Sequence, residues 1–235
     1  MTDLSDAPLN PGRHYLVDWS REDYRRRDWN DSWTDSRSWK NRLKSGLRLP
    51  VTASGLILIL CVAVYIISLI SPSFVYNYLA LNPDLLAQRP WTIITHMFVH
   101  ASFDHLFWNM LFLFFFGTEL ERRAGEGRFT TIYLLSGVAA AIGQMLVSSG
   151  SLVGASGALY GVLGCLALIA PEIRILLFFV IPLKIQYAVV LFAVMDFALS
   201  GTGDSIAHAA HLTGLLVGLV FGYVMKGQRR SYHSF

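Results

Sequence analysis

Residues 210–218 read AHLTGLLVG, and together with Gly222 they place glycines at 214, 218 and 222 of one apolar segment. These positions form two successive GxxxG spacings, which let a membrane helix bring its backbone close to a neighbour. An earlier apolar segment carries small residues at comparable spacing, at Gly157, Gly161 and Gly164. Taken alone, the pattern indicates ordinary helix packing. However, Ser156 and His211 lie where these two segments begin, so packing the segments together would bring a hydroxyl and an imidazole into contact.

The composition indicates a membrane protein. The apolar fraction is 54%, charged residues make up 15% and mean hydropathy is +0.46, whereas about 25% of the residues are charged in an average soluble domain. Roughly 20 apolar residues cross a bilayer. Six stretches approach that length, at about 51–70, 102–120, 129–148, 155–170, 183–200 and 205–225. A further run, 173–181, is too short to span and is expected to form a cytoplasmic connection lying against the bundle. We therefore predict an all-α membrane protein, a bundle of six transmembrane helices.

The basic residues predict the orientation, because lysine and arginine gather in cytoplasmic loops. With the N-terminus inside, the inner segments carry the basic residues of the N-terminal region. They also carry Arg122, Arg123, Arg128, Arg174, Lys184, Lys226, Arg229 and Arg230. The outer segments carry only Arg89. An even number of spans returns the C-terminus to the cytoplasm, so the charges and the span number agree on cytoplasmic N- and C-termini.

The first 48 residues differ from the rest of the chain. They interleave acidic and basic side chains with four tryptophans and contain no apolar run of the kind found in a signal peptide. We expect a flexible cytoplasmic tail that touches lipid headgroups, with a small folded module or partner-binding segment as the alternative. Acids nearly balance bases, which argues against nucleic-acid binding. The expected parts are thus a tail at 1–48, a six-helix domain at 49–226 and a short basic cytoplasmic tail at 227–235.

Polar residues cluster where the second, fourth and sixth apolar stretches begin. They are His105 and Asn109, then Ser156, then His208 and His211. Burying such groups in hydrocarbon costs several kcal/mol unless they are hydrogen-bonded, so intramembrane polar residues indicate function. In the predicted topology all three beginnings lie at the outer face, within about 10 Å of the surface by helical rise. The sequence therefore predicts a single site that opens toward the outside.

Three motifs, GASGALYG at 154–161, HASFDHLFWN at 100–109 and AHLTGLLVG at 210–218, together resemble the rhomboid family of intramembrane serine proteases. The likeness covers the six apolar stretches and leaves the N-terminal tail outside. It implies that Ser156, within the GxSG motif formed with Gly154 and Gly157, is the nucleophile and that His211 is its general base. It implies a dyad, with no carboxylate as a third member. A serine hydroxyl needs such a base to become nucleophilic.

The resemblance also assigns supporting roles. Asn109 and His105 would form the oxyanion hole with the backbone amide of Ser156, and Tyr160 would stack on the histidine. Glu121 and Arg123, in GTELERRAG, fall on a structural ExR pattern of the family. One departure is visible, because many bacterial rhomboids have Trp-Arg in the loop after the first span. This chain has Trp91-Thr92 there, with Arg89 nearby, so its loop lacks the arginine of the family pattern at residue 92.

The other histidines of the apolar region have alternative interpretations, as structural residues or as parts of the site. His96 and His100 are candidates for hydrogen bonds with the loop at 71–95, and His96 is equally a candidate for retaining water at the site. His208 lies one turn before His211 and competes for the role of base. We favour His211 because it lies deeper and because glycines follow it at the spacing of the family motif. His208 is then expected to line the entrance.

The expected activity is hydrolysis of peptide bonds in or near transmembrane segments of other membrane proteins, through an acyl-enzyme and without a cofactor or metal. The expected partners are transmembrane substrates and the lipid bilayer, and the expected location is a bacterial inner membrane. The main alternative is a proteolytically inactive rhomboid-like protein that binds membrane helices. A metalloprotease using histidines 96, 100, 105, 208 and 211 is disfavoured, because the chain has no HExxH and no carboxylate at metal-binding spacing. A transporter is disfavoured because the polar residues lie on one side of the membrane.

Overall fold

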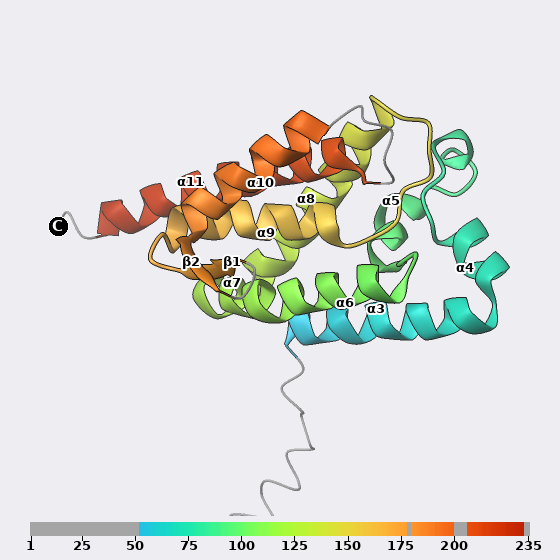
Figure 1. Ribbon diagram of the computed structural model, residues 1–235, viewed down its shortest axis with the longest axis horizontal. Helices are drawn as coiled ribbons and strands as arrows, with labels where there is room; N and C mark the ends of the chain where they lie inside the picture. Colours follow the sequence, from blue (N-terminus) through green and yellow to red (C-terminus); the bar gives the residue numbers. More distant parts are fainter. Residues whose placement is uncertain (1–51, 178–179, 200–205, 233–235) are drawn as a thin grey trace, which may run out of the picture. The chain divides into compact units, whose positions relative to one another are not determined.

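The computed structural model describes residues 52–177, 180–199 and 206–232, and the expected tail at 1–48 lies outside the described residues. The described residues belong to one compact unit (Figure 1). Its elements are α3 (Ala53–Ile70), α4 (Pro72–Tyr78), η1 (Pro83–Leu85), α5 (Thr92–Thr95), η2 (His96–Phe98), α6 (Phe103–Phe112), the π-helical turn η3 (Leu113–Gly117), α7 (Thr118–Ala124), α8 (Glu126–Met145), α9 (Ser156–Ile169), β1 (Arg174–Leu177), β2 (Ile181–Lys184), α10 (Ile185–Leu199) and α11 (His208–Tyr232).

Helices occupy the six apolar stretches of the sequence. The second stretch is one continuous helical segment made of α6, η3 and α7, and α11 continues past residue 226 to Tyr232. By length and hydropathy, Ala53–Ile70 and His208–Gln228 are the two described helices that reach membrane-spanning dimensions, whereas α9 and α10 are apolar but shorter.

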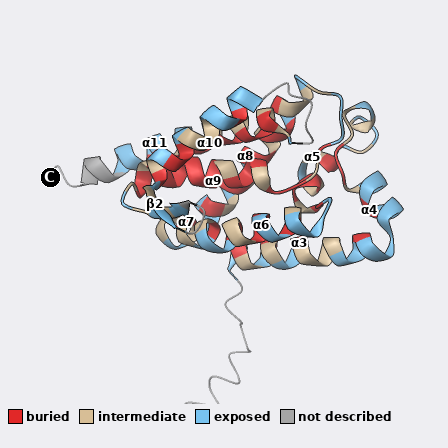
Figure 2. Cartoon of the chain, viewed as in Figure 1, coloured by how far each residue is buried: buried red, intermediate tan, exposed pale blue. Residues whose placement is uncertain are grey.

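Helix α9 forms the centre of the unit. It contacts α6, α7, α8, α10 and α11, and most of its residues are buried (Figure 2). The outer surface of the unit is apolar instead of polar, as on α3, where Ile59, Leu69 and Ile70 are 55%, 68% and 80% exposed. Such a surface would be unfavourable in water and suits contact with lipid chains. The burial pattern is therefore the one expected of a helix bundle in a membrane.

Helices α9 and α11 touch through their backbones. A Cβ atom added at Gly214 would lie 2.0 Å from the carbonyl oxygen of Gly157, and one added at Gly218 would lie 1.9 Å from the carbonyl oxygen of Gly161. No side chain fits at either position without moving a helix. The prediction that the two glycine-bearing segments pack together is confirmed, and this contact sets the position of the residues at their beginnings.

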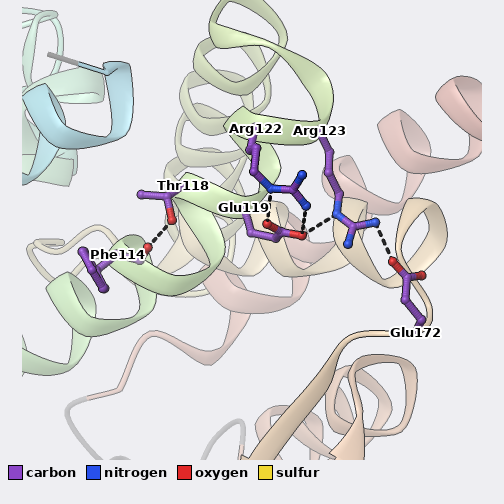
Figure 3. Close-up of polar contacts among 6 residues, drawn as sticks. All are labelled: Phe114, Thr118, Glu119, Arg122, Arg123 and Glu172. Carbon is purple, nitrogen blue, oxygen red and sulfur yellow. Dashed lines mark hydrogen bonds and ion pairs between the residues drawn. The ribbon is translucent and has the colours of Figure 1, made fainter. Parts of the chain in front are cut away.

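A charged cluster joins the end of α7 to two other parts of the chain. Glu121 accepts hydrogen bonds from the backbone N–H of Ala53 at 2.8 Å and from the N–H and hydroxyl of Ser54 at 3.0 and 2.5 Å. It thereby caps the first turn of α3, whose N–H groups have no partner within the helix. Arg123 bonds Glu119 and Glu172, both at 2.5 Å, and so ties α7 to the segment after α9 (Figure 3). Both residues of the ExR pattern thus bridge elements distant in sequence.

The connection at 173–181 differs from the expectation of a purely helical fold. Strands β1 and β2 form an antiparallel hairpin in which Arg174 pairs with Lys184 and Leu177 with Ile181. Its apolar run was too short for a membrane helix, and pairing the two halves satisfies backbone groups that a lone extended segment would leave open. Over the described residues the fold is therefore helical with one small hairpin.

The segment between α3 and α6 contains short helices held by side chains. The indole of Trp91 donates to the carbonyl oxygen of Tyr78 at 2.8 Å, and Thr92 donates to the carbonyl oxygen of Arg89 at 2.7 Å. Arg89 hydrogen-bonds the backbone of Asn77, and its guanidinium lies 4.7 Å from the centre of the Tyr78 ring. Where the family pattern has Trp-Arg, this chain thus holds the loop with Trp91 and an arginine two positions earlier.

Candidate active site

Ser156 and His211 are brought together by the contact between α9 and α11. Ser156 is the first residue of α9 and His211 lies in the first turn of α11. The Ser156 Oγ is 2.9 Å from the His211 Nε2, although the two residues are 55 positions apart in the chain. This is the distance at which a serine hydroxyl donates its proton to an imidazole.

The backbone before Ser156 takes a conformation that favours glycine. Gly154 has φ of 113°, and its N–H donates to the carbonyl oxygen of His96 at 2.9 Å. A Cβ at this position would lie 2.6 Å from the His105 Nε2. Gly154 therefore both directs the chain into α9 and lets the His105 ring approach it. Gly157, one residue past the serine, contributes the backbone contact with Gly214 described above.

Tyr160 lies one turn after Ser156, on the same face of α9. Its ring is parallel to the imidazole of His211, with 4.2 Å between ring centres and 8° between planes. Ring stacking of this kind contributes about 0.5–1.5 kcal/mol beyond the area it buries. The stack fixes the plane of the His211 ring.

Asn109 and His105 lie on α6, close to the loop that enters α9. The Asn109 amide is buried and donates to the backbone carbonyl of His105 at 2.7 Å. A side-chain amide has two N–H donors, so the second remains for another acceptor. The His105 ring packs edge-on against His100 with 5.1 Å between centres.

The other described histidines, His96, His100 and His208, are held by hydrogen bonds to backbone carbonyl groups or to a carboxylate. His96 is buried and its Nδ1 donates to the carbonyl oxygen of Thr92 at 3.1 Å. His100 is fully buried, with its Nδ1 3.3 Å from the carbonyl oxygen of Phe98. His208 does not line an entrance, contrary to expectation, because it is 6% exposed and its Nδ1 lies 2.7 Å from the Asp196 Oδ1.

The expectation of a site without a carboxylate is wrong. Asp196, on α10, is 5% exposed, and its Oδ1 lies 2.9 Å from the Nδ1 of His211, opposite the nitrogen that faces Ser156. The ligand-capable atoms of Asp196, His208 and His211 lie within 4.8 Å of one another, so a carboxylate also stands at metal-binding distance from two histidines. The sequence carried a signal: Asp196 is the one acidic residue of the apolar stretch 183–200, and an intramembrane carboxylate indicates function.

Sequence comparisons with known proteins identify the family of this chain. A sequence model of the rhomboid domain matches residues 87–228. The chain is 32% identical over 180 residues to the rhomboid protease GlpG of Yersinia pestis (strain Pestoides F), an alignment that covers 74% of this chain and 62% of the relative. It is 30% identical over 179 residues to the rhomboid protease GlpG of Yersinia enterocolitica, again covering 74% of this chain and 62% of the relative. The chain belongs to the rhomboid family.

The rhomboid domain match includes all the site residues described above, from His96 to His211. The chain spans 62% of the length of the rhomboid relatives named here. Family membership together with the apolar helices indicates an integral membrane protein. The resemblance based on three short motifs is therefore confirmed by a family match that spans residues 87–228.

Proposed function

We propose that this chain is an intramembrane serine endopeptidase that hydrolyses peptide bonds in or near transmembrane segments of other membrane proteins. The observation that carries the proposal is the 2.9 Å separation of Ser156 Oγ and His211 Nε2, with the imidazole stacked on Tyr160. Membership of the rhomboid family, whose Yersinia relatives are named proteases, supports it.

In the proposed reaction, Ser156 Oγ attacks the carbonyl carbon of the scissile bond while its proton passes to the Nε2 of His211. The tetrahedral intermediate collapses to a serine ester when the imidazolium gives that proton to the departing amine. Water then attacks the ester, again losing a proton to His211, and Ser156 regains its proton as the acid product leaves. The site is restored with one water consumed.

The oxyanion of each tetrahedral intermediate needs donors aimed at it. We assign this role to Asn109, whose amide has one N–H to spare, to His105, and to the backbone N–H of Ser156, which as the first helical residue has no partner within α9. Removing one such donor typically costs about 3 kcal/mol of transition-state stabilisation. His96 is assigned a supporting role, because its carbonyl oxygen accepts from Gly154 and so holds the loop before Ser156.

The proposal extends to topology and substrate. We infer six spans with both termini in the cytoplasm, and a site opening toward the outer face of a bacterial inner membrane, because the basic residues fall on the inner side in that arrangement. A helix hides its carbonyl groups in hydrogen bonds, so a substrate must unwind near the cleaved bond. Helix-breaking and small residues near the outer end of the substrate's span are therefore the expected recognition feature.

The test is reconstitution in liposomes with a model transmembrane substrate. Wild type should cleave the substrate, whereas Ser156→Ala and His211→Ala should reduce cleavage below detection. His208→Ala should lower cleavage less than His211→Ala does, because His208 acts through Asp196, 2.7 Å away, whereas His211 contacts Ser156 directly. Persistent cleavage by Ser156→Ala would refute the proposal. Wild type that neither cleaves nor reacts with a fluorophosphonate probe would indicate the alternative, a helix-binding protein without proteolytic activity.

A further inference from the structure

We infer that Asp196 is a positioning residue for the general base: it fixes which nitrogen of His211 faces Ser156. The inference rests on the proposed serine protease function and adds a third group, on a third helix, to the proposed pair. Its starting point is that the Asp196 Oδ1 lies 2.9 Å from the Nδ1 of His211 while the Nε2 of the same ring lies 2.9 Å from the Ser156 Oγ.

The hydrogen bond to Asp196 determines which ring nitrogen of His211 carries the proton. An ionised carboxylate can only accept hydrogen bonds, so the Nδ1 of His211 must carry the hydrogen that it shares with Asp196. In a neutral imidazole the Nε2 is then without a proton and can accept the one from the serine. The opposite tautomer would place an N–H against the Ser156 hydroxyl and could not act as a base.

Stacking on Tyr160 does not by itself determine which nitrogen of His211 faces Ser156. The Tyr160 ring holds the imidazole in one plane, but a half-turn of the ring within the same stack would exchange Nδ1 with a carbon atom. The carboxylate distinguishes these two orientations, because only one of them makes the bond to Asp196. Tyr160 and Asp196 therefore restrict different motions of the same ring.

The burial of Asp196 indicates a functional role, because a buried carboxylate contributes nothing to the solubility of the protein. The residue is 5% exposed within an apolar helix, where an unpaired carboxylate would cost several kcal/mol. It is bonded to two imidazoles, those of His208 at 2.7 Å and His211 at 2.9 Å. During the attack by Ser156 the proton moves to the Nε2 of His211, and Asp196 stays ionised and stabilises the resulting imidazolium. The second imidazole keeps the carboxylate in place.

The experiment compares full-length wild type with Asp196→Asn, which keeps the size of the side chain and removes its charge. We expect kcat to fall by up to about 10,000-fold, as for loss of the orienting carboxylate in serine proteases, while KM for the transmembrane substrate stays within about twofold. Asp84→Asn, at an exposed aspartate of η1, is the matched control and should behave as wild type. Wild-type kcat in Asp196→Asn would overturn the inference.

A spectroscopic measurement separates positioning from general support of the fold. In protein labelled with nitrogen-15 histidine, two-bond couplings report the tautomer of each imidazole. His211 should carry its proton on Nδ1 in wild type and lose that preference in Asp196→Asn, with the midpoint of thermal unfolding little changed. Wild type with the proton on Nε2 would overturn the inference even if the variant failed to fold. Failure of the protease proposal would show instead as wild type that does not cleave.

Discussion

The rings of Tyr160 and His211 lie 4.2 Å apart and within 8° of parallel, so an aromatic side chain of α9 stacks on the proposed base on α11. The contact joins the two helices that carry the reacting groups. It therefore links the packing of the bundle directly to the chemistry of the site.

The stack predicts different outcomes for two substitutions of Tyr160. Tyr160→Ala removes the ring and should lower kcat about 10- to 100-fold, because the imidazole gains freedom that must be lost again in the transition state. Tyr160→Phe keeps the ring and should retain activity within about fivefold. Cleavage rates in detergent or liposomes measure the difference, and equal rates for the two variants would contradict a role for the stack.

Asn109→Ala should slow cleavage without weakening the fold. The lost amide is an assigned oxyanion donor, and removal of one donor lowers kcat by about 100- to 1000-fold. Its hydrogen bond to the His105 carbonyl is within one helix, so the stability cost should be about 1 kcal/mol or less. Asn77→Ala, at an exposed asparagine of α4, is the control. Unchanged kcat in Asn109→Ala would remove this residue from the proposed mechanism.

Gly214→Ala should increase the distance between Ser156 and His211 by pushing α11 away from α9. The new methyl group would meet the Gly157 carbonyl at 2.0 Å, so α11 must move away from α9 at the residue that follows Ser156. Overpacking of this kind costs about 1–3 kcal/mol, and activity should fall with it. Gly227→Ala lies on the same helix with nothing within 4 Å of the added atom. It should leave activity and the unfolding midpoint unchanged or slightly raise the latter.

Glu121→Ala should destabilise the protein more than it affects catalysis. The carboxylate accepts three hydrogen bonds at the start of α3, and loss of a helix cap costs about 1–2 kcal/mol. The exposed Glu126 of α8 gives the control Glu126→Ala. Thermal unfolding measures the cost. A midpoint equal to that of the control would show that the cap contributes little.

A chelator should not inhibit cleavage. Asp196, His208 and His211 could approach a common metal ion, but in the proposed reaction His211 uses its Nδ1 for the carboxylate and its Nε2 for Ser156. EDTA is therefore expected to leave the cleavage rate unchanged, and a fluorophosphonate is expected to abolish it by reaction with Ser156. Loss of activity in EDTA that added zinc restores would favour the metalloprotease alternative.

The helical segments and the meeting of Ser156 with His211 could be anticipated from the sequence, because both follow from local pattern. Apolar length predicts the helices, and the glycine spacing predicts which helices touch. The resemblance located Tyr160 in the same way, since a residue four positions after a serine shares its helix face.

The carboxylate behind His211 required the structure. Asp196 and His211 lie on different helices, and their contact depends on how α10 is rotated against α11, which apolar composition does not specify. The β-hairpin after α9 was missed for a related reason, since a short apolar run has no period that distinguishes a paired strand from a loop. His208 was placed at an entrance because its partner on α10 was not known.

The order of the helices along the chain has a consequence for biosynthesis. Ser156 lies on α9, Asp196 on α10 and His211 on α11, which follow one another along the described chain. A chain made from its N-terminus therefore inserts the proposed nucleophile first and its base last. Until α11 packs against α9, Ser156 is an ordinary alcohol. On the proposed mechanism, a partly synthesised chain is harmless to the membrane proteins inserted beside it.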